Sequence, residues 1–216
     1  MSLKKASILI LIILLVDQIS KIYIKTHFVL GDGEKVFNWF QILFIENNGM
    51  AWGAKLGDFL SFISDRTGKL ILTVFRLAAI VGIGYWLVNT IRTKGSKILI
   101  VAISLIFAGA LGNIIDSVFY GVLFSDSYGE VSTFLPKGEG YDTLFHGRVV
   151  DMLHFPMWKG YLPEWLPFLG GQYFTFFNPV FNIADMAISS GIGLLLVFNK
   201  KAFPKEDISK EVIQED

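Results

Sequence analysis

The chain has 216 residues, of which 53% are hydrophobic and 18% are charged, and its mean hydropathy is +0.54. The 19 basic and 19 acidic side chains cancel, which argues against a nucleic-acid-binding protein, because such proteins carry a basic patch or stripe. The lack of cysteine excludes thiol nucleophiles, cysteine–zinc sites, disulfides and lipidated cysteines. The high apolar content indicates a membrane protein.

Four stretches are apolar over a length close to the roughly 20 residues that a helix needs to cross a bilayer. The predicted spans are residues 6–24, 70–88, 98–115 and 181–198. No small-x-small cleavage site follows the first span, which continues into Asp17, Gln18 and Lys21, so we interpret it as a retained helix and not as a signal peptide. The sequence therefore predicts a single all-α membrane domain, residues 1–216, with four transmembrane helices.

Basic residues collect at the span ends that lie on one side of this topology. They are Lys4 and Lys5 before the first span, Arg92, Lys94 and Lys97 in the short connector, and Lys200 and Lys201 after the fourth span. Because positive residues favour the cytoplasmic side, we expect both termini, the connector 89–97 and the tail 199–216 to be cytoplasmic. The two long connectors, 25–69 and 116–180, are then outside.

The two outer connectors have an unusual composition. Residues 36–53 alternate apolar and polar side chains in places, which favours short strands, and Asn47-Asn48-Gly49 favours a turn. The second connector is rich in aromatic side chains: Trp158, Trp165, Tyr173, Phe174, Phe176 and Phe177. Since aromatic residues favour the headgroup layer, we expect a small β-rich cradle and a long outer loop to rest on the outer membrane boundary.

Four aspartates lie where the membrane makes a charge costly. They are Asp17 late in the first span, Asp116 after the third, Asp151 within the apolar run Val149–Leu153, and Asp185 just inside the fourth. The predicted topology brings all four to the same outer depth. Because ionisable groups at membrane depth are expensive, these residues are candidates for a functional site.

Two asparagines accompany these aspartates. Asn113 precedes Asp116 by three residues, and Asn182 precedes Asp185 by three. Residues at i and i+3 share a helix face, so the two pairs predict one polar pocket inside the bundle. Such pairs can also cap or pack helix ends, and Asp17 with Lys21 at i+4 has the spacing of a structural salt bridge.

Two neighbouring carboxylates cannot both ionise easily, so one keeps a proton while the other acts as a base toward water, as in aspartic proteases. A serine mechanism is less favoured, because Ser189 and Ser190 lie deeper than any basic residue placed nearby. A magnesium or calcium site needs a dense acidic loop, which the sequence lacks. We interpret His146 and His154 as interfacial, and no metal is predicted.

Other features have plain structural interpretations. Arg76 in the second span either snorkels outward or pairs with a carboxylate. The glycines of the third and fourth spans favour close helix packing; they are Gly109, Gly112, Gly191 and Gly193.

Five short motifs follow one another along the chain. They are Asp17-Gln18-Ile19-Ser20-Lys21, Asn47-Asn48-Gly49-Met50-Ala51-Trp52-Gly53, Gly112-Asn113-Ile114-Ile115-Asp116, Val149-Val150-Asp151 and Phe181-Asn182-Ile183-Ala184-Asp185. In order, in spacing to the spans and in side of the membrane, they resemble the lipoprotein signal peptidases (signal peptidase II), four-helix intramembrane aspartyl peptidases of bacteria. The resemblance extends over most of the chain.

The resemblance implies that Asp151 and Asp185 are the catalytic pair, a choice that helix depth alone does not make. It implies a supporting or substrate-binding set as well: Asp17, Lys21, Asn47, Gly49, Asn113, Asp116, Arg148 and Asn182. The family usually has an arginine directly after the third-span aspartate, where this chain has Ser117, and Arg148 is a conjectural replacement. The stretches 117–147 and 155–177 are also long for the family.

The implied reaction is hydrolysis of a prolipoprotein signal peptide just before a cysteine that carries diacylglycerol. The resemblance implies no metal or organic cofactor, lipidated prolipoproteins and membrane lipids as partners, no nucleic acid, a monomer, and a place in the bacterial cytoplasmic membrane with the site toward the outer face. A proton-conducting transporter would need ionisable groups spaced across the bilayer, and a non-enzymatic scaffold gives no reason for two Asn-x-x-Asp pairs.

Overall fold

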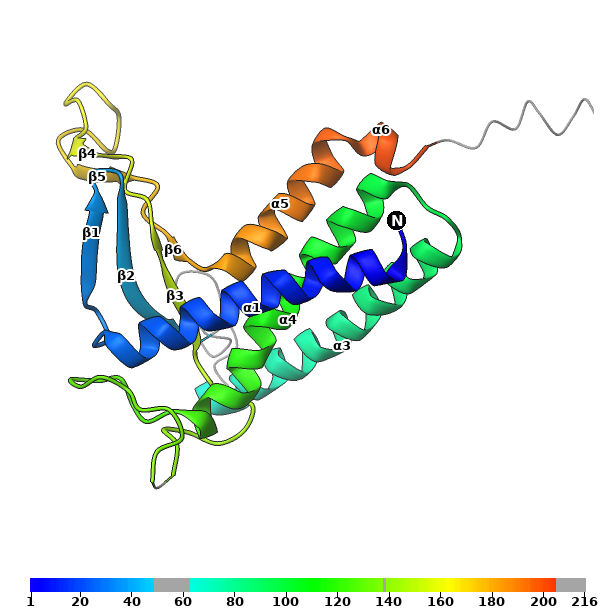
Figure 1. Ribbon diagram of the computed structural model, residues 1–216. Helices are drawn as coiled ribbons and strands as arrows, with labels where there is room; N and C mark the ends of the chain where they lie inside the picture. The colour runs from blue at the N-terminus through cyan, green and yellow to red at the C-terminus, as the bar shows by residue number, and fades with distance from the viewer. Residues whose placement is uncertain (49–62, 138, 205–216) are drawn as a thin grey trace, which may run out of the picture.

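The computed structural model describes residues 1–48, 63–137 and 139–204. The helices are α1 (Leu3–His27), α3 (Asp65–Arg92), α4 (Lys97–Leu123), α5 (Ile183–Val197) and α6 (Asn199–Ala202) (Figure 1). The strands are β1 (Gly33–Phe37), β2 (Phe40–Asn47), β3 (Val149–His154), β4 (Trp158–Tyr161), β5 (Tyr173–Phe176) and β6 (Val180–Phe181). The prediction of an all-α protein is therefore wrong, because the fold is mixed.

Serine caps set the starts of the long helices. Ser2, Ser64 and Ser96 each accept a hydrogen bond from the backbone N–H three residues later, which satisfies one free donor of the first turn of α1, α3 and α4. Among the described residues these three helices are long and apolar enough to cross a membrane. Each extends beyond its predicted bounds, and α4 continues for seven residues past Asp116.

The fourth predicted span is shorter than expected. Helix α5 has 15 residues, which corresponds to about 22 Å and falls short of a hydrocarbon core of roughly 30 Å. Phe181 belongs to β6 and Asn182 is the N-cap, so the chain at the predicted start of the span is extended. Three long apolar helices and one shorter apolar helix thus replace the four predicted spans of similar length.

Helix α4 is the centre of the bundle and packs against α1, α3 and α5. Small residues allow this close approach: a Cβ on Gly109 would lie 2.2 Å from the Ala184 carbonyl oxygen, and one on Gly112 would lie 2.7 Å from Asp17 Oδ2. A Cβ on Gly191 would likewise lie 2.7 Å from the Ala102 carbonyl oxygen. The expected role in close helix packing is confirmed for these three glycines and is wrong for Gly193, where a Cβ would meet nothing within 4 Å.

A four-stranded antiparallel sheet, in the order β1-β2-β3-β6, lies at one end of the helices, and the N-terminus, the α3–α4 connector and α6 lie toward the other (Figure 1). The strands expected within residues 36–53 are present, although their hairpin turns at Asn38–Trp39. Of the turn expected at Asn47-Asn48-Gly49, Asn47 ends β2 and Gly49 lies outside the described residues.

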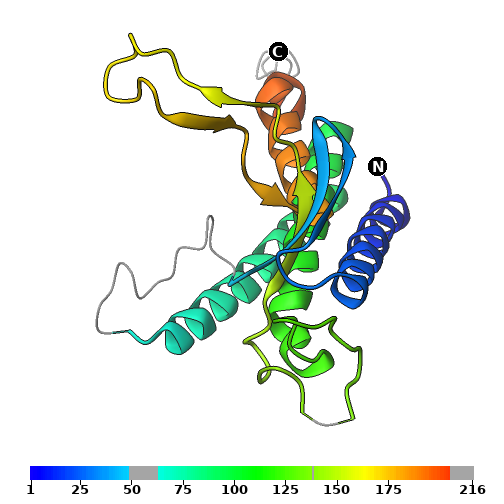
Figure 2. The same ribbon diagram turned by 90° about the vertical axis from the view of Figure 1, so that its left-hand side faces the viewer.

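The second long connector also contains a hairpin, formed by β4 and β5, that extends away from the helices (Figure 2). Most of its aromatic side chains are exposed: Trp158, Tyr161, Trp165, Phe168, Tyr173, Phe174 and Phe176. The side chains of His146 and His154 are buried, at 8% and 6% exposure.

Candidate active site

The pairing of β2 with β3 places Asp151 near the end of β2. In the antiparallel register of β2 and β3, Ile45 lies opposite Asp151 and Asn47 lies opposite Val149. Side chains two residues apart on a strand share a face, so Asn47 and Asp151 are diagonal neighbours. Asn47 Nδ2 donates to Asp151 Oδ2 at 3.4 Å, and Asp151 is only 4% exposed.

Asn182 joins Asp151 to Asp185. It is the N-cap of α5, with extended backbone angles, and forms a capping box in which the Asp185 N–H donates to Asn182 Oδ1 at 2.9 Å and the Asn182 N–H donates to Asp185 Oδ2 at 3.2 Å. Its Nδ2 donates to Asp151 Oδ1 at 2.7 Å. Of the two interpretations of this Asn-x-x-Asp pair, the helix cap is the one that the structure shows, and the cap also reaches Asp151.

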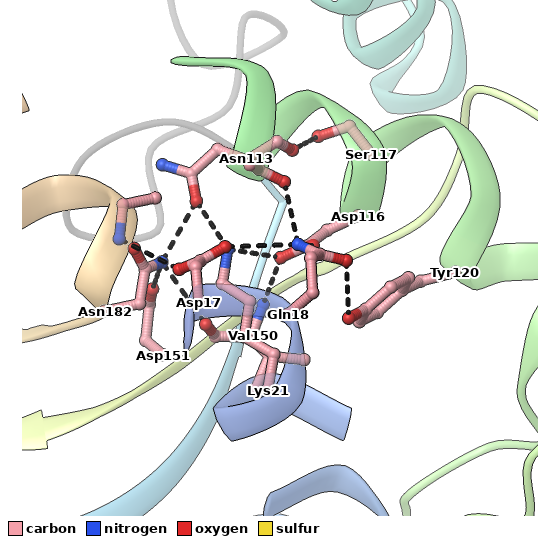
Figure 3. A network of polar contacts seen from close by, with 12 residues as sticks. Asp17, Gln18, Lys21, Asn113, Asp116, Ser117, Tyr120, Val150, Asp151 and Asn182 are labelled. Atoms are coloured by element: carbon pink, nitrogen blue, oxygen red, sulfur yellow. Dashed lines mark hydrogen bonds and ion pairs between the residues drawn. The ribbon is translucent and has the colours of Figure 1, made fainter. Parts of the chain in front are cut away.

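Asn113 on α4 completes the link between the helices. Its Nδ2 donates to Asp185 Oδ1 at 2.9 Å. Its Oδ1 accepts hydrogen bonds from Asn182 Nδ2 at 3.1 Å and from Lys21 Nζ at 2.9 Å. The two asparagines and the two aspartates thus belong to one network, drawn from α4, β3 and the start of α5. Figure 3 shows Asn113, Asn182 and Asp151 in this network.

Lys21 on α1 lies between two fully buried carboxylates. Its Nζ is 2.9 Å from Asp17 Oδ2 and 2.8 Å from Asp116 Oδ2, and all three side chains are at most 1% exposed. The salt bridge expected between Asp17 and Lys21 is confirmed, and Lys21 is also the cation beside Asp116.

The same two carboxylates hold the backbone next to the candidate catalytic residues. Asp116 Oδ2 accepts the N–H of Val150 at 3.3 Å, and Asp17 Oδ1 accepts the N–H of Ala184 at 2.9 Å. Val150 and Ala184 directly precede Asp151 and Asp185 in the sequence. Each supporting carboxylate therefore fixes the residue before one member of the pair.

Two members of the network were not among the predicted site residues. Gln18 Nε2 donates to Asp116 Oδ1 at 3.0 Å and to Asp17 Oδ2 at 3.1 Å, while its Oε1 accepts from the Tyr120 hydroxyl at 3.2 Å (Figure 3). Gln18 was visible in the first motif. Tyr120 was missed because the third span was predicted to end at residue 115, which hid its position one turn after Asp116 on α4.

Arg148 is not part of this network, whereas Ser117 contacts one of its members. Arg148 Nη1 pairs with Glu46 at 2.8 Å and with Asp126 at 3.2 Å, whereas Ser117 donates to the Asn113 carbonyl at 2.9 Å. Gly49 lies outside the described residues. Arg76 is partly buried on α3, where its charge interacts with that of Asp185.

The surroundings of Asp151 favour its protonated form. Burial, and after it the negative charge of Asp185, raise the pKa of Asp151 to about 7, although Lys21 and hydrogen bonds from Asn182 and Asn47 act in the opposite direction. A carboxyl group with such a pKa can hold or release a proton near neutral pH. Within the described residues, no cluster of three or more histidine, aspartate or glutamate side chains could hold a metal ion.

Comparisons with known proteins identify the family. The sequence profile of the family described as "Signal peptidase (SPase) II" matches residues 9–200. The chain belongs to this family. It is 49% identical over 195 residues to a lipoprotein signal peptidase of Porphyromonas gingivalis, a match that covers 90% of this chain and 82% of that protein. It is 36% identical over 205 residues to a lipoprotein signal peptidase of Amoebophilus asiaticus, covering 93% and 79% of the two chains.

Solved structures support the same assignment. A bacterial membrane enzyme determined by the in meso method is 25% identical, with a TM-score of 0.55 over 95% of this chain and 94% of that one. The resemblance found in the sequence motifs is thereby confirmed. The protein is an aspartic-type signal peptidase II, a multi-pass bacterial membrane protein that removes signal peptides from prolipoproteins.

Proposed function

We propose that Asp151 and Asp185 are the catalytic pair of this peptidase and that they cleave the prolipoprotein just before its lipidated cysteine. The observation that carries the proposal is Asn182, which donates its side-chain N–H to Asp151 at 2.7 Å and its backbone N–H to Asp185 at 3.2 Å. One residue thus sets the separation and orientation of both carboxyl groups.

The two aspartates differ in their surroundings, which suits different roles. Both oxygens of Asp185 accept hydrogen bonds, from Asn113 and Asn182, and Asp185 lies in the first turn of α5, where the helix dipole favours a negative charge. Asp151 has a pKa raised to about 7 by burial and by the charge of Asp185. We therefore assign Asp185 as the base that takes a proton from the attacking water. Asp151 is the acid that protonates the nitrogen of the leaving amine.

The test is cleavage of a diacylglyceryl-modified prolipoprotein by purified protein in detergent, followed as a mass shift. General acid–base catalysis contributes about 10²–10⁴ in rate, and these variants also lose the positioning of the water. Asp151→Asn and Asp185→Asn are thus expected to be inactive while remaining folded. Asp116→Asn is the matched control and should retain reduced activity. Substantial cleavage by either folded dyad variant would contradict the assignment.

We propose that the whole chain is one integral membrane unit with both termini in the cytoplasm and the site at the outer face. The basic residues that support this orientation include Lys4 at the start of α1, Arg92 at the end of α3 and Lys200 in α6. The N-terminus, the α3–α4 connector and α6 lie at the end of the helices opposite the sheet (Figure 1). The prediction is tested with reporter enzymes fused after residue 200. A fusion that is active only in the periplasm would overturn the orientation.

The membrane surroundings suit a lipidated substrate. The aromatic side chains exposed on the β4–β5 hairpin are of the kind that favours the headgroup layer, which supports a cradle resting on the outer boundary. We propose that the peptidase works as a monomer, that the site opens sideways to lipid and that the outer connectors exclude water until the scissile bond is placed. Cleavage by detergent-solubilised monomers isolated by size exclusion tests the first point.

A further inference from the structure

A second buried ionic cluster lies beside the active site, and the proposed mechanism does not use it. Lys25 Nζ on α1 pairs with Glu46 Oε1 on β2 and donates to the Ser127 hydroxyl at 2.8 Å, and this hydroxyl donates to Glu46 Oε1 at 3.0 Å. Glu46 Oε2 pairs with Arg148 Nη1 at 2.8 Å, and Asp126 lies 3.2 Å from the same nitrogen.

Aromatic rings line this cluster. Lys25 Nζ lies 4.8 Å from the centre of the Tyr141 ring and 5.4 Å from that of Phe124, and Arg148 Cζ lies 4.7 Å from the Tyr141 ring. The Arg148 backbone N–H donates to the Tyr141 hydroxyl at 2.6 Å. Rings at these distances attract cations, so both basic groups are held by more than their ion pairs.

The centre of the cluster is Glu46. Its side chain is 1% exposed, and it accepts from Lys25 and Arg148 through different oxygens. Two cations and two anions balance one another in the cluster. Removing the Glu46 charge therefore leaves two buried or half-buried cations with Asp126 alone, which lies partly in solvent.

Sequence and strand register connect this cluster to the active site. Glu46 directly precedes Asn47, and Arg148 directly precedes Val149, the residue opposite Asn47 in the sheet. Successive side chains of a strand point to opposite faces. Glu46 therefore fixes β2 from one face while Asn47 reaches Asp151 on the other.

Helix α1 carries the anchor for both clusters. Lys21 and Lys25 are one turn apart, so they lie on the same helix face. Lys21 pairs with the supporting carboxylates Asp17 and Asp116, and Lys25 pairs with Glu46 near the end of β2. The strands that carry Asn47 and Asp151 are thus fixed to the same helix as the supporting carboxylates.

We propose that Glu46 is a positioning residue, which uses Lys25 and Arg148 to hold the ends of β2 and β3 so that Asn47 and Asp151 keep their mutual geometry. This inference rests on the proposed catalytic role of Asp151. It assigns a function to Arg148 other than replacement of a cation at position 117, because Arg148 acts on the active site through Glu46.

The test variant is Glu46→Gln, with Glu34→Gln on the exposed strand β1 as the matched control. A small misplacement of a reacting group costs up to about a hundredfold in rate, so Glu46→Gln should lower kcat about ten- to a hundredfold while KM stays within about twofold. Glu34→Gln should match the wild type in both constants.

The pH profile separates positioning from a general loss of structure. The Asn47 hydrogen bond lowers the pKa of Asp151, so losing it raises that pKa and moves the alkaline limb of the profile to higher pH. Glu46→Gln should reproduce the pH shift of Asn47→Ala. The variant that combines Glu46→Gln with Asn47→Ala should show no further shift. A kcat loss without any shift, or shifts that add, would overturn the proposal.

The double variant Lys25→Met/Glu46→Gln covers the case in which Glu46→Gln does not fold. It removes one cation with one anion, so the buried charges balance again and the melting temperature should recover. Its kcat should stay low, because β2 is still released from α1. Recovery of kcat together with stability would show that only charge balance matters and would refute positioning. Activity in Asp151→Asn would instead refute the proposed function itself.

Discussion

Replacing the buried carboxyl group of Asp151 should have opposite effects on activity and stability. Its pKa is raised from 3.8 to about 7, first by burial and then by the charge of Asp185, so the folded state resists ionisation. Each pKa unit corresponds to about 1.36 kcal/mol, so ionised Asp151 lowers the free energy of unfolding by about 4 kcal/mol. Asp151→Asn removes this cost while it removes the catalytic acid.

The sign of the pH dependence follows from linkage. Below the unfolded pKa of 3.8 both states of wild-type Asp151 are protonated and the cost is zero. As the pH rises toward the folded pKa of about 7, only the unfolded state releases its proton, so wild-type stability falls. The excess free energy of unfolding of Asp151→Asn over the wild type should grow from about 2 kcal/mol at pH 5 to about 4 kcal/mol at pH 8.

Thermal melting in detergent at pH 5 and pH 8 measures this difference, with prolipoprotein cleavage measured on the same samples. For a protein of this size, about 4 kcal/mol corresponds to a rise in Tm on the order of 10 °C at pH 8. The 3.4 Å contact from Asn47 is long, so a change in it offsets little of the gain. An inactive variant that melts below the wild type at pH 8 would refute the burial argument.

Three further predictions concern the network and the packing around it. Asn113→Ala should fold but lose about ten- to a hundredfold in cleavage rate, because a hydrogen bond to a charged group is worth roughly 1.5–3 kcal/mol; wild-type turnover would remove it from the site. Lys21→Met leaves two buried carboxylates unpaired, which costs about 3–5 kcal/mol, and should abolish a cooperative melt of purified protein at neutral pH. Gly109→Ala places a Cβ 2.2 Å from a carbonyl of α5 and should lower Tm, whereas Gly193→Ala meets nothing within 4 Å and should not; equal melting would contradict the close helix contact.

Local signals in the sequence were sufficient for the broad architecture. Apolar runs of near-spanning length predicted the helices, because a bilayer requires such runs wherever they occur in the chain. Isolated carboxylates and amides near span ends predicted one polar site, since charge at membrane depth has to be partnered. The ordered motifs identified the family, and with it the peptidase activity.

Only the tertiary structure decided how these residues meet. The register of β2 and β3 brings Asn47 to Asp151, and the extended backbone at Asn182 shortens α5 and turns a predicted helix face into a cap. Arg148 pairs with Glu46, a contact between residues 102 positions apart. Strand register and cap geometry depend on contacts between distant segments, which no local pattern contains. The sequence therefore determined which residues are present at the site, and packing determined which atoms face one another.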